Sequence, residues 1–229
     1  MLKLRIYCTF LLLFLTGYCS SAQKNNFVVY AGVKASAGTG AMNRTDVAML
    51  LRNDGTFTDK LGEQNWRTAV KGKYTQTATK LTLNYAGKKA VIYNVTKKGN
   101  LSRRGQILSK FSKPNIPKGG FEYKKSSGNG GMGTNQDYVG SSSSKYFYFD
   151  DRNRFTTKQS SNTTVVGSQV GGGTGKKSTD SGTYSLVNGE LTLKFDNGST
   201  KKYSCFVSRP VGKDGDMLLI NGSFYFRKN

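Results

Sequence analysis

Residues 72–93 read GKYTQTATKLTLNYAGKKAVIY, and residues 182–203 read GTYSLVNGELTLKFDNGSTKKY. Both stretches contain, in the same order, a G-x-Y, an L-T-L-x-aromatic segment and a closing tyrosine. The offset between the copies is constant, since it is the same from Gly72 to Gly182, from Leu81 to Leu191 and from Tyr93 to Tyr203. A shared register of this length indicates an internal duplication of one β unit.

The duplication extends upstream to a turn. Residues 53–57 of the first copy read Asn-Asp-Gly-Thr-Phe, and the second copy has Asp150 and Asp151 followed by Phe155. N-D-G is a strong hairpin signal because glycine accepts a positive φ. We therefore predict that Asp150 and Asp151 occupy the turn positions of Asn53 and Asp54.

The L-T-L-x-aromatic segment predicts which side chains enter the core. Apolar and polar residues alternate along it, as in a strand with one buried face. If the protein binds a small apolar ligand, the inward residues would line or floor the site. A solidly packed interior is the alternative, since small barrels are usually filled by their own side chains. The six inward residues are Leu81, Leu83, Tyr85, Leu191, Leu193 and Phe195.

Strand signals dominate the chain, and no segment shows a sustained helical period in its apolar residues. Pro114 and Pro117 mark the join between the copies, because proline cannot donate a hydrogen bond to a β ladder. We therefore predict a first repeat unit at residues 23–118 and a second at residues 119–229.

The second unit carries two Gly/Ser-rich stretches, at residues 126–133 and 167–178, which we expect to be loops. It ends on the apolar run Met217-Leu218-Leu219-Ile220, an Asn221-Gly222 turn and an aromatic strand. This pattern predicts a terminal β-hairpin.

The N-terminus resembles a secretory signal peptide over residues 1–22. Lys3 and Arg5 supply a positive n-region, residues 6–15 an apolar h-region, and Ser20-Ser21-Ala22 a cleavage site. The apolar run is shorter than the roughly 20 residues that a spanning helix needs. We therefore predict an exported protein, located in the periplasm, at the cell surface or outside the cell.

The cysteines fit an exported chain that has a core of its own. Cys8 and Cys19 would leave with the signal peptide, so Cys205 would remain alone and no intramolecular disulfide could form. The alternative to export after cleavage is a protein anchored to the membrane by a lipid on Cys19. Cys205 lies among apolar residues, which predicts a small buried hydrophobe rather than a reactive thiol.

The charge favours a polyanionic partner. The chain has 35 Lys and Arg against 13 Asp and Glu, a formal net charge of +22, which signal cleavage would lower by two to +20. An acidic glycan, a lipopolysaccharide or a nucleic acid would be attracted to it. Solubility alone is the other explanation. The best candidate contact is the basic segment between the copies, with Lys97, Lys98, Arg103, Arg104, Lys124 and Lys125.

Several catalytic chemistries are excluded or disfavoured. The chain has no histidine, which removes the Ser-His-Asp and Cys-His nucleophilic systems and the commonest zinc ligand. A secreted hydrolase that uses two carboxylates stays open, but most aspartates stand beside Gly or Asn in predicted turns. The glycine-rich residues 171–178 lack the order of a phosphate-binding loop and precede no helix. We expect no cofactor, no metal and no catalysis.

These motifs together resemble secreted bacterial lipocalin-like β proteins, most of unknown function. The resemblance rests on N-D-G-x-F, G-x-Y, L-T-L-x-[YF] and the terminal I-N-G-x-x-Y-x-R, and it covers nearly all of residues 45–95 and 145–229. It implies a small barrel with room for an apolar interior, and no catalytic residues. True lipocalins carry a G-x-W near the mature N-terminus, whereas the one tryptophan here is Trp66.

The expected fold is all-β, with two related antiparallel meander units of about six strands each. We expect them to pack as one lipocalin-like barrel or as a barrel pair. We favour one barrel-like body over two separate barrels, because a short meander alone buries little apolar surface. The expected function is binding or envelope association by an exported protein, with an apolar ligand or an acidic polymer as partner.

Overall fold

The structure is a computed structural model, and it describes residues 27–37, 42–111, 115–129, 138–166, 171–208 and 216–228. The predicted signal peptide, residues 1–22, and the predicted lipid-anchor residue Cys19 lie outside these residues. Nothing in the described part forms a helix of the length and apolarity needed to cross a bilayer.

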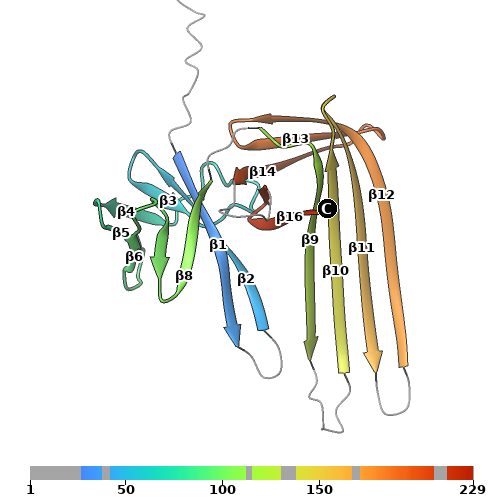
Figure 1. Cartoon of the computed structure of the whole chain (residues 1–229), viewed down its shortest axis with the longest axis horizontal. Helices are drawn as coiled ribbons and strands as arrows, with labels where there is room; N and C mark the ends of the chain where they lie inside the picture. Colours follow the sequence, from blue (N-terminus) through green and yellow to red (C-terminus); the bar gives the residue numbers. More distant parts are fainter. Residues whose placement is uncertain are drawn as a thin grey trace, which may run out of the picture.

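The described strands close into two antiparallel barrels, each a meander in which neighbours along the chain pair (Figure 1). Barrel 1 contains β1 (Phe27–Ala37), β2 (Met42–Arg52), β3 (Thr56–Thr58), β4 (Gly72–Gln76), β5 (Lys80–Tyr85), β6 (Val91–Val95), β7 (Leu101–Arg103) and β8 (Gln106–Phe111). Barrel 2 contains β9 (Gly119–Asn129), β10 (Tyr138–Phe149), β11 (Arg154–Val166), β12 (Gly171–Val187), β13 (Glu190–Phe195), β14 (Thr200–Ser208), β15 (Met217–Ile220) and β16 (Ser223–Lys228). The predicted all-β fold of two related units is confirmed, in its barrel-pair form. The favoured arrangement of one barrel-like body is wrong, because each unit has enough strands to close on itself.

The two barrels repeat one another in register as well as in strand order. Leu81 pairs with Tyr93 across β5 and β6, and Leu191 pairs with Tyr203 across β13 and β14. The barrels also close alike, because β8 returns to β1 and β16 returns to β9. The duplication read from residues 72–93 therefore extends around the whole barrel.

The upstream alignment differs by one residue from the predicted one. The N–H of Tyr74 donates to the carbonyl of Gly55 at 2.7 Å, and the N–H of Tyr184 donates to the carbonyl of Asn153 at 2.8 Å. Gly55 and Asn153, both at positive φ, are therefore equivalent. By this equivalence Asp151 of the second copy aligns with Asn53 of the first. Asp150 therefore aligns with the residue before Asn53, one position before the predicted turn.

Each barrel has eight described strands rather than about six. The short β7 has three residues and no apolar alternation that would reveal it. Its turn into β8 is made by Arg104 and Gly105, both at positive φ, as in the Asn221-Gly222 turn of barrel 2. A two-residue turn of this kind matches the twist of the strands that it joins, but Arg104 is not a residue that signals it.

The predicted loops of the second unit are partly strands. Residues 126–129 belong to β9, and residues 171–178 belong to β12 and pair with β11 from Gly171–Val166 to Ser178–Gln159. The four strands β9 to β12 run together well beyond the rest of barrel 2 (Figure 1). Where the structure describes them, the serine and threonine side chains there are mostly exposed. The ladder of backbone hydrogen bonds between the strands, rather than side-chain packing, therefore holds this part together. Composition alone does not show such a ladder.

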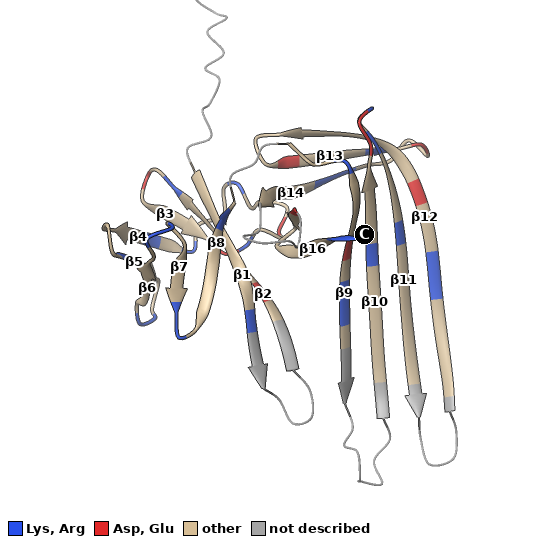
Figure 2. Ribbon diagram, in the orientation of Figure 1, with Lys and Arg blue, Asp and Glu red and all other residues tan. Residues whose placement is uncertain are grey.

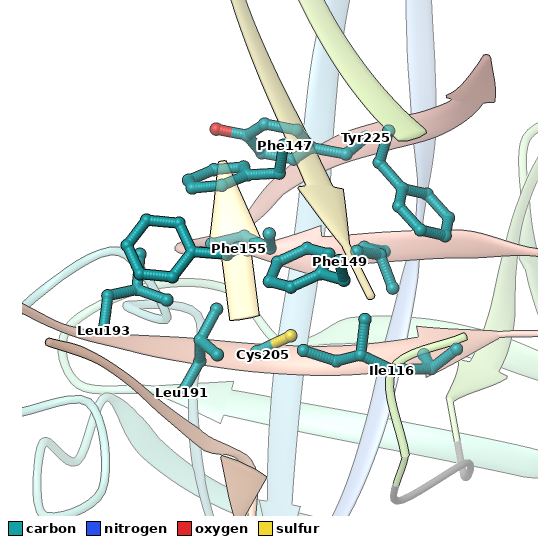
Figure 3. Packing of buried hydrophobic residues seen from close by; sticks show 12 residues of the cluster. Ile116, Phe147, Phe149, Phe155, Leu191, Leu193, Cys205 and Tyr225 are labelled. Carbon is teal, nitrogen blue, oxygen red and sulfur yellow. The ribbon is translucent and has the colours of Figure 1, made fainter. Parts of the chain in front are cut away.

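Large side chains fill the interior of each barrel. In barrel 2, rings from β10 and β11 meet leucines from β13 and the thiol of Cys205 (Figure 3). Phe147 and Phe149 stack with centroids 5.7 Å apart, and Phe155 meets Phe195 edge-to-face at 5.1 Å. Barrel 1 uses the equivalent positions with smaller residues, among them Met49 and Leu51 in place of Phe147 and Phe149.

A third apolar cluster joins the barrels to one another. Trp66 lies edge-to-face against Phe206 of β14 with ring centroids 5.7 Å apart, and Phe111 of β8 packs near Phe224 of β16. Consecutive residues of β2, β14 and β15 are buried, so both faces of these strands are covered. This explains the continuous apolar runs at residues 47–51 and 217–220, which do not alternate with polar residues. The buried residues of this interface are Val29, Ala31, Ala48, Leu50, Leu61, Trp66, Phe111, Phe206, Leu219 and Phe224.

Hydrogen bonds fix the position of one barrel on the other. The buried hydroxyl of Ser204 donates to the carbonyl of Leu61 at 2.6 Å, and the N–H of Phe224 donates to Oδ2 of Asp46 at 3.0 Å. Arg67 donates to the carbonyl of Asn188 at 2.9 Å. The two barrels are thus one packed body.

We expect this interface to contribute a large share of the stability. Leu219 is fully buried within it, so Leu219→Ala would open a cavity and lower the free energy of unfolding by about 2–5 kcal/mol. The control Val187→Ala removes an apolar side chain that is 63% exposed. Such a surface change should alter the free energy of unfolding by about 0.5 kcal/mol or less. Chemical denaturation of both variants measures the difference, and equal effects would contradict the described interface.

Glycine is required where the L-T-L-x-aromatic strand passes its neighbour. A Cβ on Gly182 would strike the carbonyl oxygen of Lys194, and one on Gly72 would strike that of Asn84. Backbone cannot move aside as a flexible side chain can, so the glycine of G-x-Y is sterically fixed in both copies. The same strand β12 contains Gly172, where an added Cβ would meet open space.

We therefore predict that Gly182→Ala destabilises the protein by about 1–3 kcal/mol through overpacking. Gly172→Ala, in the same strand, should leave the midpoint of thermal unfolding nearly unchanged. Thermal melts followed by circular dichroism compare the two. A Gly182→Ala variant as stable as Gly172→Ala would show that the strands are not this close.

Candidate functional site

The six residues predicted to line an apolar site lie inside the barrels. Leu81, Leu83, Leu191 and Leu193 are fully buried and belong to the packed cores, while Tyr85 and Phe195 are half-buried beside them. Burial raises the pKa of the Tyr85 hydroxyl to about 12, and this hydroxyl donates to Oδ2 of Asp59 at 3.4 Å. The four leucines make their contacts with other side chains of the same cores.

The six predicted cationic residues fall into two different barrels. Lys97 and Lys98 lie in the β6–β7 turn, and Arg103 and Arg104 lie at the other end of β7, all in barrel 1. Arg103 stands over the ring of Tyr93 at 6.0 Å. Lys124 and Lys125 are neighbours on β9 of barrel 2, where successive side chains point to opposite faces. The structure therefore does not gather the six into one surface.

A groove on the outer face of barrel 2 collects other cations. It has a volume of about 430 Å³ and lies across β9 to β12, close to the end of β16. Figure 2 shows Lys and Arg spread along these long strands. We call it the basic groove, and it is lined by Glu122, Ser144, Tyr146, Lys158, Gln159, Ser160, Lys177, Ser178, Thr179 and Lys228.

Strand register builds most of this lining. Glu122 pairs with Tyr146, Tyr146 with Lys158, and Lys158 with Thr179, so these four side chains form one row across the sheet. Their neighbours along each strand point into the barrel, as the burial of Phe147 shows. A second outer row contains Lys124, Ser144, Ser160 and Lys177.

The groove carries a surplus of positive charge. Glu122 accepts ion pairs from Lys124 at 3.0 Å and from Lys228 at 3.9 Å. Among the residues that the structure describes, no carboxylate lies within ion-pair distance of Lys158 or Lys177. These two ammonium groups are therefore available to an anionic ligand.

Tyr146 adds an aromatic surface to the groove. Its ring lies against Gly120 of the neighbouring strand, where a side chain would collide with it, and the Nζ of Lys228 stands 5.7 Å from its centroid. Tyr148, two residues on, faces the same way and is 39% exposed. A flat ring beside hydroxyl and ammonium groups can stack on a sugar ring or a base, while the lysines bind the negative charges of the same ligand.

The aspartates near the turns act locally. Asp54 accepts hydrogen bonds from the hydroxyl of Thr56 at 2.7 Å and from its N–H at 2.9 Å, and these bonds lower the pKa of the carboxyl group. Asp196 accepts from the hydroxyl of Ser181 at 2.6 Å, which lowers its pKa in the same way. A general acid of a glycosidase needs a raised pKa instead. In the described part of the chain no three metal-ligating residues cluster.

Lys158, Lys177 and Lys228 are functional candidates that sequence reasoning misses. Lys177 falls in a predicted loop, and Lys158 stands alone in a stretch of serine and threonine, so neither forms a charge run. The register of β11 against β12 places them on adjacent rows of one face. Treating residues 154–181 as a hairpin would find the pair, but Gly/Ser-rich composition indicates a loop.

Comparison with known proteins gives no match: no family model, no curated protein and no solved structure is similar to the chain. Function is therefore inferred from the residues and geometry of this chain.

We predict that Cys205 is unreactive in the folded protein. It is 1% exposed, and burial raises the pKa of its thiol to about 12, so the nucleophilic thiolate is scarce at neutral and mildly alkaline pH. Ellman's reagent should give no reaction with the native protein at a pH near the pKa of an ordinary thiol, about 8.5. In denaturant it should titrate one thiol when the protein is prepared without residues 1–22. A rapid native reaction would contradict this packing.

Proposed function

We propose that this protein is an exported, non-catalytic binding protein that holds an acidic polysaccharide along the basic groove. The observation that carries the proposal is the pairing of Lys158 and Lys177, which have no carboxylate partner among the described residues, with the aromatic surface of Tyr146. The formal net charge of +22 would draw a polyanion to the protein at long range.

The groove suits a sugar polymer. Ser144, Ser160 and Thr179 present small hydroxyl groups between the lysines, and such groups can both donate to and accept from sugar hydroxyls. The half-buried ring of Tyr146 lines the groove and would supply the aromatic contact. The basic groove therefore supports the polyanion hypothesis at a different place from the predicted segment around residues 97–125.

Two other functions have less support. An apolar ligand inside a barrel would have to replace the packing of Leu81, Leu83, Leu191 and Leu193, whose side chains are completely buried. A carboxylate-based hydrolase would need an acid with a raised pKa, whereas hydrogen bonds in turns lower the pKa of Asp54 and Asp196.

The test is elution from heparin beside a cation exchanger of matched charge density. The wild-type protein should leave heparin at clearly higher salt than it leaves the exchanger. In Lys158→Gln/Lys177→Gln this excess should disappear. Binding of a heparin oligosaccharide should weaken about tenfold or more, and the slope of log K against log salt should fall by about two, one for each lost cation.

The matched control is Lys88→Gln/Lys89→Gln, which removes the same charge from an exposed turn of barrel 1. It should keep the heparin excess, and so should Lys97→Gln/Lys98→Gln. Equal losses in all three variants would mean that the charge is diffuse and would overturn the proposal. Preferential binding of single-stranded DNA over the oligosaccharide in the wild type would reject a polysaccharide as the partner.

A further inference from the structure

The inner face of barrel 2 carries a second group of cations, on the opposite side of the sheet from the basic groove. Lys145 directly precedes Tyr146 on β10, so its side chain points inward rather than into the groove. Its Nζ stands 5.0 Å from the ring centroid of Phe147 and 5.2 Å from that of Tyr203. This ammonium group is thus half-buried above two aromatic rings at one end of the filled core.

Lys145 has no counter-charge among the described residues. No carboxylate lies within ion-pair distance of it, and the charged group that acts on it is Lys201, whose own Nζ lies 5.3 Å from the ring of Phe195. Burial, and then the charge of Lys201, lower the pKa of Lys145. Asp180 shares the inner face but pairs across the strands with Thr157, and it makes no ion pair with Lys145. A half-buried charge without a partner costs stability.

Aromatic rings and a hydroxyl group without a hydrogen-bond partner lie near Lys145. Tyr123 pairs with Lys145 across β9 and β10, and its ring lies 5.5 Å from that of Tyr225. Thr157 follows on the next inner row, and its hydroxyl is buried without a hydrogen-bond partner in the described residues. Buried hydroxyl groups are normally satisfied, so the unsatisfied one points to an additional polar group at this end of the barrel.

Barrel 1 has apolar residues at the positions equivalent to Lys145 and Lys201. Val47, which pairs with Gly32, is the equivalent of Lys145, which pairs with Tyr123. Val91 pairs with Leu83 as Lys201 pairs with Leu193. Both valines pack against the core of barrel 1. The same fold is therefore closed by apolar residues in one copy, whereas the other copy has two lysines there. Departures of this kind from good packing are expected at functional sites.

We propose that this end of barrel 2 binds a small organic anion, with one negatively charged group held between Lys145 and Lys201 and a flat body packed on Tyr123 and Tyr203. The charged group would supply the counter-charge that the described residues lack. This site is distinct from the basic groove, and it does not depend on the polysaccharide proposal.

The probe is benzoate, with acetate as the matched anion that lacks a ring. The protein carries ¹³C-methyl groups on its lysines, a modification that preserves their charge, and the Lys145 signal is followed by NMR. Benzoate should shift this signal in a saturable way, and acetate should bind about tenfold more weakly or worse. Lys145→Met keeps the side-chain stem without the charge. Its benzoate affinity, measured by calorimetry, should fall at least tenfold, which corresponds to about 1.4 kcal/mol.

A second variant, Lys201→Gln, keeps the proposal testable if Lys145→Met does not fold. Lys201→Gln changes an exposed side chain and should weaken benzoate binding severalfold. Lys158→Gln, on the outer face of the same sheet, should bind benzoate like the wild type although it binds heparin less well. The proposal is overturned if Lys145→Met retains wild-type benzoate affinity, if acetate binds as tightly as benzoate, or if benzoate does not shift the Lys145 signal at all.

Discussion

The strands β1 and β2 are buried on both faces, by the core of their own barrel on one side and by β14, β15 and β16 on the other. This double burial determines how the rest of the molecule is arranged. Apolar residues on one face of these strands fill their own barrel. Those on the other face, together with Trp66 of barrel 1, meet Phe206 and Phe224 of barrel 2. One side of barrel 2 is committed to this contact. The long strands β9 to β12 form the remaining side (Figure 1), and the basic groove lies across their outer face. The interface thus decides which surface is free to bind.

Duplication supplied two copies of one barrel, and the copies have diverged in what they present. Barrel 1 has valines at positions 47 and 91 that pack against an apolar core. In barrel 2 the strands β9 to β12 are long and rich in serine, threonine and glycine, and lysines stand on both of their faces. Because the register is shared, each difference can be assigned to a single position. The comparison of one barrel with the other therefore shows where barrel 2 has a charged side chain and barrel 1 an apolar one.

The core can be predicted from the sequence better than the site. Leu81, Leu83, Leu191 and Leu193 can be placed because strict alternation around L-T-L has one interpretation. The inter-barrel contact is harder: Met217-Leu218-Leu219-Ile220 predicts a strand, but so short an apolar run does not identify what covers its second face. The basic groove cannot be predicted from the sequence. Lys158 and Lys177 are distant in sequence, and only the register of β11 against β12 brings them together, in a hairpin whose composition is that of a loop.

The most direct test is to locate the binding surface by backbone NMR during titration with a size-defined acidic oligosaccharide. We predict that the perturbed amides will cluster on β9 to β12 around Glu122, Tyr146, Lys158 and Lys177, and near Lys228 at the end of β16. The turns of barrel 1 at residues 96–105 should remain unchanged at saturation. Perturbations centred on those turns, or spread evenly over both barrels, would contradict the claim that the free face of barrel 2 is the binding surface.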